Sequence, residues 1–302
     1  MQNPLHSRST RLRSGLSLML LTALLAAPAL PASAQNRAAD VEADSTTPSS
    51  QQVVNIMVGN EAASADHRGY YFYLAEERSE HTGGHLWSER VAETSWGKVH
   101  YLLAEDGQPL SGDRLAQEKA RVAGEAADPE AFRKSEQARI DDEQHAKQML
   151  ELLPKAFLFD PPTTQGENIR IKFRPNPAYS PQSLEERVIH GMSGFVLIDR
   201  KRLRLHEVEG KLASDVSIGF GFLATIHAGS NFSSVRIPLE GKDWKTQALH
   251  TDINGRALFL KTIARQQQSQ HSGFKKIPDN LSVADAVALL ERDPPDGPAS
   301  TR

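Results

Sequence analysis

Cysteine is absent from this chain of 302 residues. The protein therefore forms no disulfide, has no thiol nucleophile and cannot bind zinc or an iron–sulfur cluster through sulfur. Its stability in an oxidising compartment must come from a hydrophobic core. Aromatic residues make up only 6% of the chain, so a local cluster of them is informative.

The chain also lacks an excess of positive charge. Its 35 Lys and Arg residues stand against 38 Asp and Glu, which gives a net charge of -3. Without a basic stripe it is a poor nucleic-acid binder and has little electrostatic attraction to a membrane surface. Beyond the N-terminus no segment is long and apolar enough to span a bilayer. We therefore expect no nucleic-acid partner and no transmembrane span in the mature chain.

The N-terminus has the three zones of a secretory signal peptide. Arg8, Arg11 and Arg13 form a positive region, 15–27 is apolar, and Ala32-Ser33-Ala34 is a small-residue cleavage site. The alternative is an uncleaved anchor helix, for which the apolar run is short. We predict that 1–34 is removed, which leaves 32 basic against 38 acidic residues and a net charge of -6. The mature protein is expected in the periplasm.

The mature chain predicts one β-rich domain, 52–278, between two less ordered segments. Residues 35–51 are rich in Ala, Asp, Ser and Thr without apolar periodicity, which is typical of a disordered lead. Residues 279–302 predict a short helix, capped by Ser282, and a loose tail.

Short alternating segments with turn signals predict many sequential strands in the domain. Asp106-Gly107 predicts a turn, and Asn254-Gly255 predicts a type I′ hairpin between strands 244–253 and 257–268. A change of apolar parity in 203–212 predicts a β-bulge near His206-Glu207. The order of elements favours an α+β fold with a strongly curved antiparallel sheet and helices on one side.

Residues 111–153 form a helical insertion in this pattern. They are rich in Ala, Glu, Gln, Lys and Arg, and Asp128-Pro129 suits a helix N-cap followed by proline at the first helical position. The middle of the stretch is almost wholly polar. We therefore expect this insertion to project from the body and to dock only by its ends.

The second half resembles bacterial envelope proteins described as outer-membrane lipoprotein-sorting-like. The resemblance is carried by Gly-Met-Ser-Gly-Phe-Val-Leu-Ile-Asp at 191–199, Asp-Val-Ser-Ile-Gly-Phe-Gly at 215–221, Trp244, and Gly-Arg-Ala-Leu-Phe-Leu-Lys at 255–261. It implies an incomplete β-barrel with helices on its concave side, able to hold acyl chains. The insertion at 111–153 departs from the plain carrier pattern and would fill or cap the concave side. No arginine matches the switch residue of the carrier.

Residue patterns typical of catalysis are weak. His81 and His85 flank a Gly-Gly turn, where two exposed histidines are a better interpretation than a zinc site. Asp141, Asp142 and Glu143 lie among basic and amide side chains, as on a solvated helix face. No nucleophile lies near a base. We therefore expect no enzyme activity, no metal and no cofactor.

The remaining candidate is an apolar ligand site. Ile218, Phe220, Phe222 and Ile226 would share one face of a strand over 217–226 whose other face carries small residues, and Tyr71 and Tyr73 are candidate neighbours. Plain sheet curvature for the glycines and core packing for the tyrosines are the alternatives. The pattern predicts a carrier of a lipid or of lipoprotein acyl chains. The alternative is a non-enzymatic envelope scaffold with a filled core and a protein partner.

Overall fold

The structure, a computed structural model, describes residues 48–64, 69–218, 224–257 and 261–292. The predicted signal peptide, most of the predicted lead and the tail after Arg292 lie outside these residues. The elements are α1 (Ser50–Ser64), β1 (Tyr70–Ser79), β2 (Trp87–Thr94), β3 (Gly97–Glu105), β4 (Gln108–Pro109), α2 (Gly112–Ala127), α3 (Pro129–Ala156), β5 (Phe157–Phe159), β6 (Thr163–Gln165), β7 (Asn168–Pro175), α4 (Leu184–His190), β8 (Met192–Asp199), β9 (Leu205–Leu212), β10 (Val216–Ile218), β11 (Ala224–Ile226), β12 (Asn231–Pro238), β13 (Trp244–Ala257), β14 (Lys261–Ile277) and α5 (Val283–Arg292).

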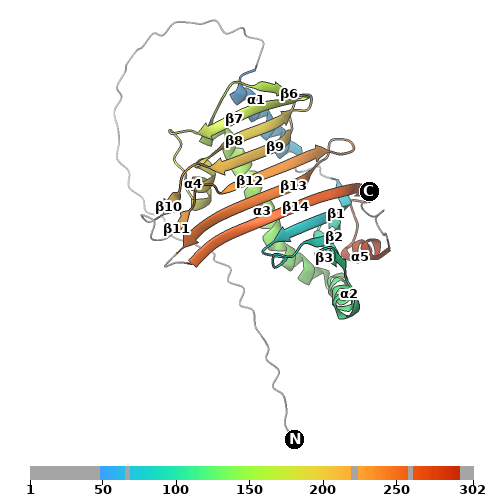
Figure 1. Ribbon diagram of the computed structural model, residues 1–302. Coiled ribbons are helices and arrows are strands. Elements are labelled where there is room, and N and C mark those ends of the chain that lie inside the picture. The colour runs from blue at the N-terminus through green and yellow to red at the C-terminus, as the bar shows by residue number, and fades with distance from the viewer. Residues whose placement is uncertain (1–47, 65–68, 219–223, 258–260, 293–302) are drawn as a thin grey trace, which may run out of the picture. The chain divides into compact units, whose positions relative to one another are not determined.

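The 14 strands form one antiparallel sheet that does not close on itself (Figure 1). Their order is β4-β3-β2-β1-β14-β13-β12-β9-β8-β7-β5, with β6 added to β7 and the β10–β11 hairpin added to β13. The predicted combination of an antiparallel sheet with helices is confirmed. No helix within the described residues is long and apolar enough to cross a membrane.

Two local predictions about the strands are confirmed. Asp106 and Gly107 have φ values of 51° and 77° in the turn between β3 and β4, the left-handed region that this residue pair favours. The pairing of β8 with β9 skips His206, which is the expected bulge. Because of it, Leu205 and Val208 join the same core cluster although their sequence parity differs.

The hairpin predicted at Asn254-Gly255 is wrong. Both residues lie inside β13, and the chain turns after Ala257 instead. A Cβ on Gly255 would lie 2.4 Å from the carbonyl oxygen of Thr225 and 3.1 Å from Cα of Ile226. Glycine is therefore required here by the close approach of β11 and not by a turn.

The single alternating strand predicted over 217–226 is also wrong. The structure has two short strands, β10 and β11, which pair with Ser217 opposite Thr225. The hydroxyl oxygens of these two residues lie 3.0 Å apart. Residues 219–223, which connect the strands and include Phe220 and Phe222, lie outside the described residues.

The predicted helical insertion consists of α2 and α3, and α3 continues through Pro154 to Ala156. The backbone N–H of Ala131 donates to the Asp128 side chain over 3.0 Å, which confirms the predicted cap. Ser282 caps α5 in the same way, accepting from the N–H of Asp285 over 3.1 Å. Helix α4 was not predicted. Helix α1 begins inside the predicted lead and continues past Gly59.

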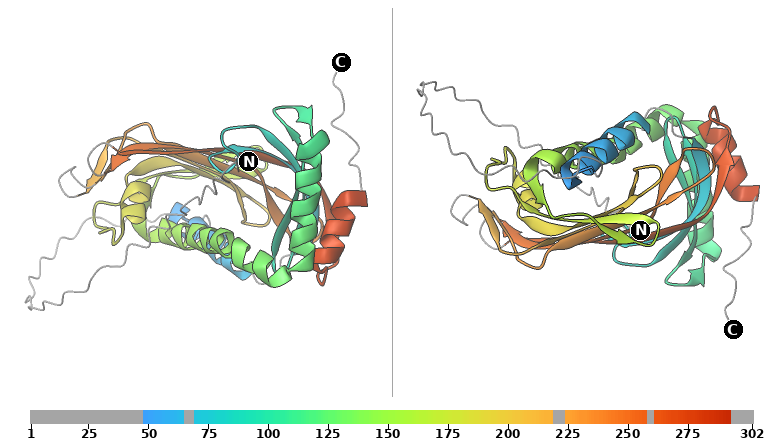
Figure 2. Two further views of the ribbon diagram at one scale, coloured as in Figure 1. Left: turned by 90° about the horizontal axis from the view of Figure 1, so that it is seen from below. Right: turned by 90° about the horizontal axis from the view of Figure 1, so that it is seen from above.

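Helices α1 and α3 lie over one face of the sheet, which we call the inner face (Figure 2). At β7–β9 this face is apolar and packs against α1 and the end of α3. At β1–β3 the inner face carries only a small apolar cluster, Tyr71, Tyr73, Ala75 and Val91, and the larger cluster lies on the opposite, outer face. This outer face packs against α2, α5 and the start of α3 in a second core cluster, which contains Phe72, Val99, Val122, Phe132 and Leu290.

Candidate functional site beneath helix α3

Helix α3 is attached to the rest of the protein by its two ends. Its buried residues are Phe132 and Glu136 near the start and Leu153 and Ala156 at the end. None of the residues 137–152, which we call the α3 span, is buried. The expectation that the insertion 111–153 docks only by its ends is wrong, because Val122 and Phe132 in its middle are buried. Helix α3 also lies over the sheet and does not project away from it (Figure 2).

Helix α3 crosses the sheet from one edge to the other. Its 28 residues give a length of about 42 Å at about 1.5 Å per residue. Ten strands follow one another from β3 to β5, and nine spacings of about 4.8 Å make about 43 Å. The start of α3 contacts β3, and its end contacts α1, α4 and β5. Between these ends, the guanidinium of Arg265 on β14 lies 4.0 Å from the carboxylate of Asp142.

The inner face changes character beneath α3. Cross-strand partners lie on the same face of a sheet, so the strand registers define rows of side chains. One row comprises Ile171, Val196, Val208, Ser234, Leu249, Ser269 and Glu77. The next comprises Phe173, Gly194, Gly210, Phe232, Thr251, Gln267 and Ser79. Both rows run from apolar residues at β7 to polar residues at β1.

The middle of these rows is only half-covered. We call Phe232, Ser234, Leu249, Thr251, Gln267 and Ser269 the central strip. All except Ser269 are half-buried, although the α3 span crosses this region. The strip combines two apolar side chains with hydroxyl and amide groups.

The apolar end of the inner face, at β7–β9, is filled by side chains. Val54 and Met57 of α1 are fully buried there, together with Ile171, Val196 and Ile198 of the sheet. Burying apolar side chains of this size contributes about 1.5–3 kcal/mol each. This end therefore forms the main anchor of α1 and of the end of α3.

The charged end, at β1–β3, holds buried ion pairs beside the small apolar cluster of Tyr71, Tyr73, Ala75 and Val91. It comprises Glu89, Glu93, Lys98, His100, Glu136, Arg139, Glu143 and Lys245. Nδ1 of His100 lies 2.9 Å from Oε2 of Glu89, and the two side chains are 17% and 8% exposed. Nζ of Lys245 lies 2.5 Å from Oε2 of Glu93, and Lys98 pairs with Glu143 of the α3 span.

The Glu89–His100 pair fixes the orientation of the imidazole. Burial by itself would raise the pKa of Glu89, but the charge and hydrogen bond of His100 outweigh it, so the pKa lies below its ordinary value. An ionised carboxylate accepts only, so Nδ1 of His100 is the donor. Nε2 of His100 is buried and has no hydrogen-bond partner among the described residues.

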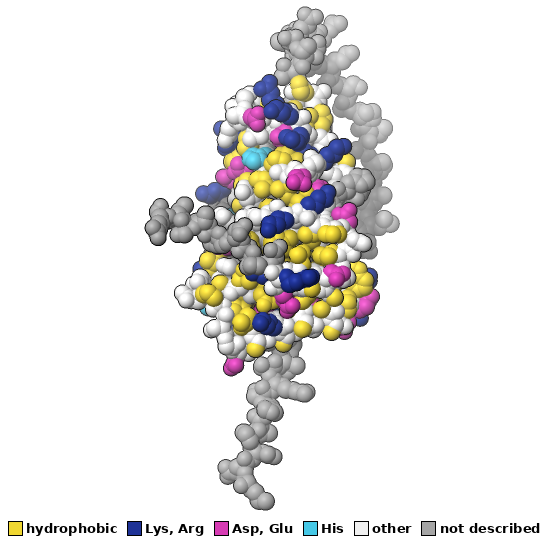
Figure 3. Space-filling view, turned by 90° about the vertical axis from the view of Figure 1, so that its right-hand side faces the viewer, with side chains coloured by type: hydrophobic (Ala, Val, Ile, Leu, Met, Phe, Trp, Pro, Cys, Tyr) yellow, Lys and Arg dark blue, Asp and Glu magenta, His cyan; other side chains and the backbone are white. Residues whose placement is uncertain are grey.

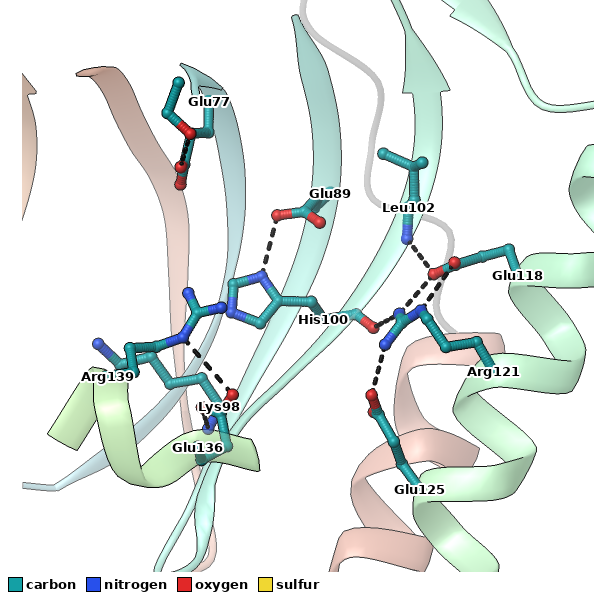
Figure 4. A network of polar contacts seen from close by, with 11 residues as sticks. Glu77, Glu89, Lys98, His100, Leu102, Glu118, Arg121, Glu125, Glu136 and Arg139 are labelled. Atoms are coloured by element: carbon teal, nitrogen blue, oxygen red, sulfur yellow. Dashed lines mark hydrogen bonds and ion pairs between the residues drawn. The ribbon is translucent and has the colours of Figure 1, made fainter. Parts of the chain in front are cut away.

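Helices α2 and α3 cover the edge of β3 with side chains (Figure 4). The carboxylate of Glu118 accepts from the N–H of Leu102 over 2.8 Å, and Glu136 accepts from the N–H of Lys98 over 3.1 Å. Between them, Nη2 of Arg121 donates to the carbonyl of His100 over 2.6 Å. Edge strands usually need such cover against pairing with other chains. These contacts also fix where α3 starts its path across the sheet.

The predicted ligand-binding residues are not brought together. Tyr71 and Tyr73 are buried on the inner face of β1 around Phe274, and the Tyr71 hydroxyl donates to Asp243 over 2.8 Å. Ile226 belongs to another cluster. Tyr71 pairs with residue 276 of β14. Ile226 pairs with Gly255 of β13, which pairs with residue 263 of β14. The two positions on β14 are thirteen residues apart, which corresponds to about 40 Å along the strand.

The other predicted residues have simpler placements. Of the Ile218, Phe220 and Phe222 group, only the backbone of Ile218 is described, in β10. Nδ1 of His85 lies 2.6 Å from the Asp106 carboxylate, and the His81 ring lies edge-on to Trp87. Among the described residues no three His, Asp or Glu side chains are placed to hold a metal ion.

The charged end was missed by reasoning from sequence. The alternation that puts Val99 and Tyr101 on one face of β3 puts Lys98 and His100 on the other, and that polar parity was a usable signal. The partners of these residues were not recognisable. Glu143 was assigned to a solvated helix face, yet it pairs with Lys98.

Comparison with known proteins found no matching family model, no matching curated protein and no matching solved structure.

Proposed function

We propose that the protein is a periplasmic holder of an elongated lipid or acylated ligand, bound between the α3 span and the central strip. In this proposal the sheet curves around α3 as an incomplete barrel, with α1 and α3 on its concave side. In this proposal the protein only binds its ligand. It carries out no catalytic step and uses neither a metal nor a cofactor.

One observation carries the proposal. A helix anchored at both ends crosses strands whose side chains stay half-buried, and no residue of the α3 span is buried against them. Side chains in protein interiors normally interdigitate until they are fully buried. A sheet face that stays partly exposed beneath a helix suits a flexible ligand with an apolar surface.

The composition of the central strip supports the same ligand class. Leu249 offers an apolar contact beside Phe232, which also packs against Met192, Leu212 and Ile226. Ser234, Thr251 and Gln267 offer hydrogen bonds. The resemblance of 191–199 and 215–221 to the lipoprotein-sorting-like family points to the same use of a curved sheet.

A specific observation also favours the alternative, a scaffold with a filled core. Both ends of the inner face are already occupied by the protein's own side chains. A small closing movement of α3 would fill the centre too. On the face shown in Figure 3 hydrophobic side chains alternate with charges of both signs, so this face does not select a class of protein partner.

Filling the strip tests the proposal. Leu249→Trp adds bulk to the strip, whereas Val235→Trp places the same indole on the outer face of the adjacent strand β12. With cis-parinaric acid as a fluorescent probe, we expect wild type and Val235→Trp to bind and Leu249→Trp to lose at least ten-fold in affinity. Both variants should keep the thermal midpoint within a few degrees. Equal binding by all three proteins, or no binding by wild type, would overturn the proposal.

Export is tested separately. N-terminal sequencing of the protein from the cell envelope is expected to begin at Gln35. A chain that retains Met1 in a membrane fraction would contradict the periplasmic location and leave the binding test unaffected.

A further inference from the structure

The carboxylates of the charged end already have partners. Those of Glu89, Glu93 and Glu143 pair with His100, Lys245 and Lys98. The carboxylate of Glu136 accepts from the N–H of Lys98 and lies 3.5 Å from Nε of Arg139. Their capacity to accept further hydrogen bonds from a ligand is therefore small.

Two other side chains of this end, and the neighbouring Tyr73, still have polar atoms without a hydrogen-bond partner. Among the described residues, the two terminal guanidinium nitrogens of Arg139, the Tyr73 hydroxyl and Nε2 of His100 have no hydrogen-bond partner. The guanidinium nitrogens of Arg139 are donors only, the Tyr73 hydroxyl can donate as well as accept, and Nε2 is the ring nitrogen of His100 that Glu89 leaves unpaired. Of these atoms Nε2 of His100 is buried, and a buried polar group without a partner costs about 1–3 kcal/mol. A ligand that supplies acceptor atoms would remove this cost.

These side chains lie close together and next to the central strip. Tyr73, Val91 and His100 are consecutive cross-strand partners, so they share the inner face. In Figure 4 the guanidinium of Arg139 points toward the imidazole of His100. The ring of Tyr73 contacts that of His271 at a centroid distance of 5.0 Å, and His271 is two residues from Ser269 of the strip on β14.

We infer that Arg139, His100 and Tyr73 bind the anionic group of the ligand, a carboxylate or a phosphate, while its apolar chain lies along the central strip. Arginine presents a planar pair of N–H groups that matches either anion. Nδ1 of His100 is held by Glu89, which leaves Nε2 as the buried ring nitrogen available to the bound group. The inference rests on the proposed function, because it needs the chain to occupy the strip.

Isothermal titration calorimetry with four probes tests this assignment: decyl phosphate, decanoate, decanol and inorganic phosphate. We expect wild type to bind the two chain-bearing anions at least ten-fold more tightly than decanol, and inorganic phosphate much more weakly. Arg139→Gln should lose about ten-fold in affinity for the anions and keep its affinity for decanol. Lys134→Gln, which removes an exposed cation from the same helix, is the matched control and should behave as wild type.

The outcomes separate the inference from the proposed function. Equal affinity for decanol and the anions would overturn the anionic site and leave the chain site standing. Inorganic phosphate that binds as tightly as decyl phosphate would show a free-anion site, which also overturns the inference as stated. An equal loss of affinity for the anions in Lys134→Gln would show that only the net charge of the protein matters, and would overturn the assignment to Arg139. Failure of every chain-bearing probe to bind would end both proposals.

Discussion

The two ends of the inner face attach the same helix by opposite chemistry. At β7–β9, fully buried aliphatic side chains such as Val196 and Ile198 surround the end of α3. At β1–β3, Glu136 near the start of α3 accepts from the backbone N–H of Lys98, and Glu143 of the α3 span pairs with the Lys98 side chain. Phe132 adds an apolar contact on the outer face. The apolar end gains free energy from area removed from water. The charged end gains less net free energy, because desolvation offsets the attraction between the charges.

The two ends respond differently to substitution. Apolar packing tolerates changes of shape if volume is kept, whereas a buried ion pair becomes costly as soon as one partner is removed. The charged end thus fixes the position of α3 more than it stabilises the fold. Between the two ends, no residue of the α3 span is buried, and the central strip stays half-buried beneath it.

The largest effect is expected from a charge placed at the apolar end. Val196→Asp buries a carboxylate without a partner and should cost about 4 kcal/mol or more, enough to unfold a marginal protein. Leu249→Asp, in the half-buried central strip, should cost about 1–2 kcal/mol because water still reaches the side chain. Urea unfolding followed by circular dichroism gives both values. Equal costs would show that the strip is as closed as the apolar end.

At the charged end, the edge of β3 offers the next largest effect. The side chain of Glu118 is 3% exposed and accepts from the N–H of Leu102 and from Arg121. Glu118→Ala leaves the N–H of Leu102 unsatisfied and removes one of the partners of Arg121, which keeps Glu125 and the His100 carbonyl; it should cost about 2–4 kcal/mol. Glu118→Gln keeps one acceptor oxygen and should cost about half as much. Chemical unfolding measures both, and a neutral Glu118→Ala would contradict the role given to the edge contacts.

Acid should weaken the charged end before the apolar end. His100 holds the pKa of Glu89 below its ordinary value despite burial. Glu89 thus adds stability above the unfolded-state pKa of about 4.3, and this stability is lost as the pH falls through the lower folded-state pKa. Glu89→Gln should cost about 1 kcal/mol at pH 7 and flatten the acid limb of a stability–pH curve. An unchanged acid limb would contradict this assignment.

The sequence predicted features that depend on local patterning. Strand alternation, the cap at Asp128, the bulge at His206 and the polar middle of the insertion all report on a few consecutive residues. The hairpin at Asn254-Gly255 was wrong because the same glycine also suits close approach by β11, a contact between segments about thirty residues apart. Local sequence does not distinguish these two uses of glycine.

The candidate site was less predictable than the fold for the same reason. Lys98 finds its partner on the α3 span, 45 residues later in the chain, and Glu93 finds Lys245, 152 residues later. Charged residues on a strand are normally expected to face solvent. Lys98 and His100 of β3 are instead covered because α3 crosses that face of the strand. The predicted apolar site combined Tyr71 with Ile226, which lie at opposite ends of β14.

The smallest expected effect tests the α3 span itself. Ala146 is exposed within the span, and Ala286 of α5 is fully buried. Ala146→Gly should cost about 1 kcal/mol or less, the intrinsic helix penalty alone. Ala286→Gly adds the loss of a buried methyl group and should cost about 2 kcal/mol. Hydrogen exchange should show faster opening of the span amides in Ala146→Gly without a matching change at β7–β9. If Ala146→Gly cost as much as Ala286→Gly, the span would pack on the central strip, and the ligand would have no place beneath it.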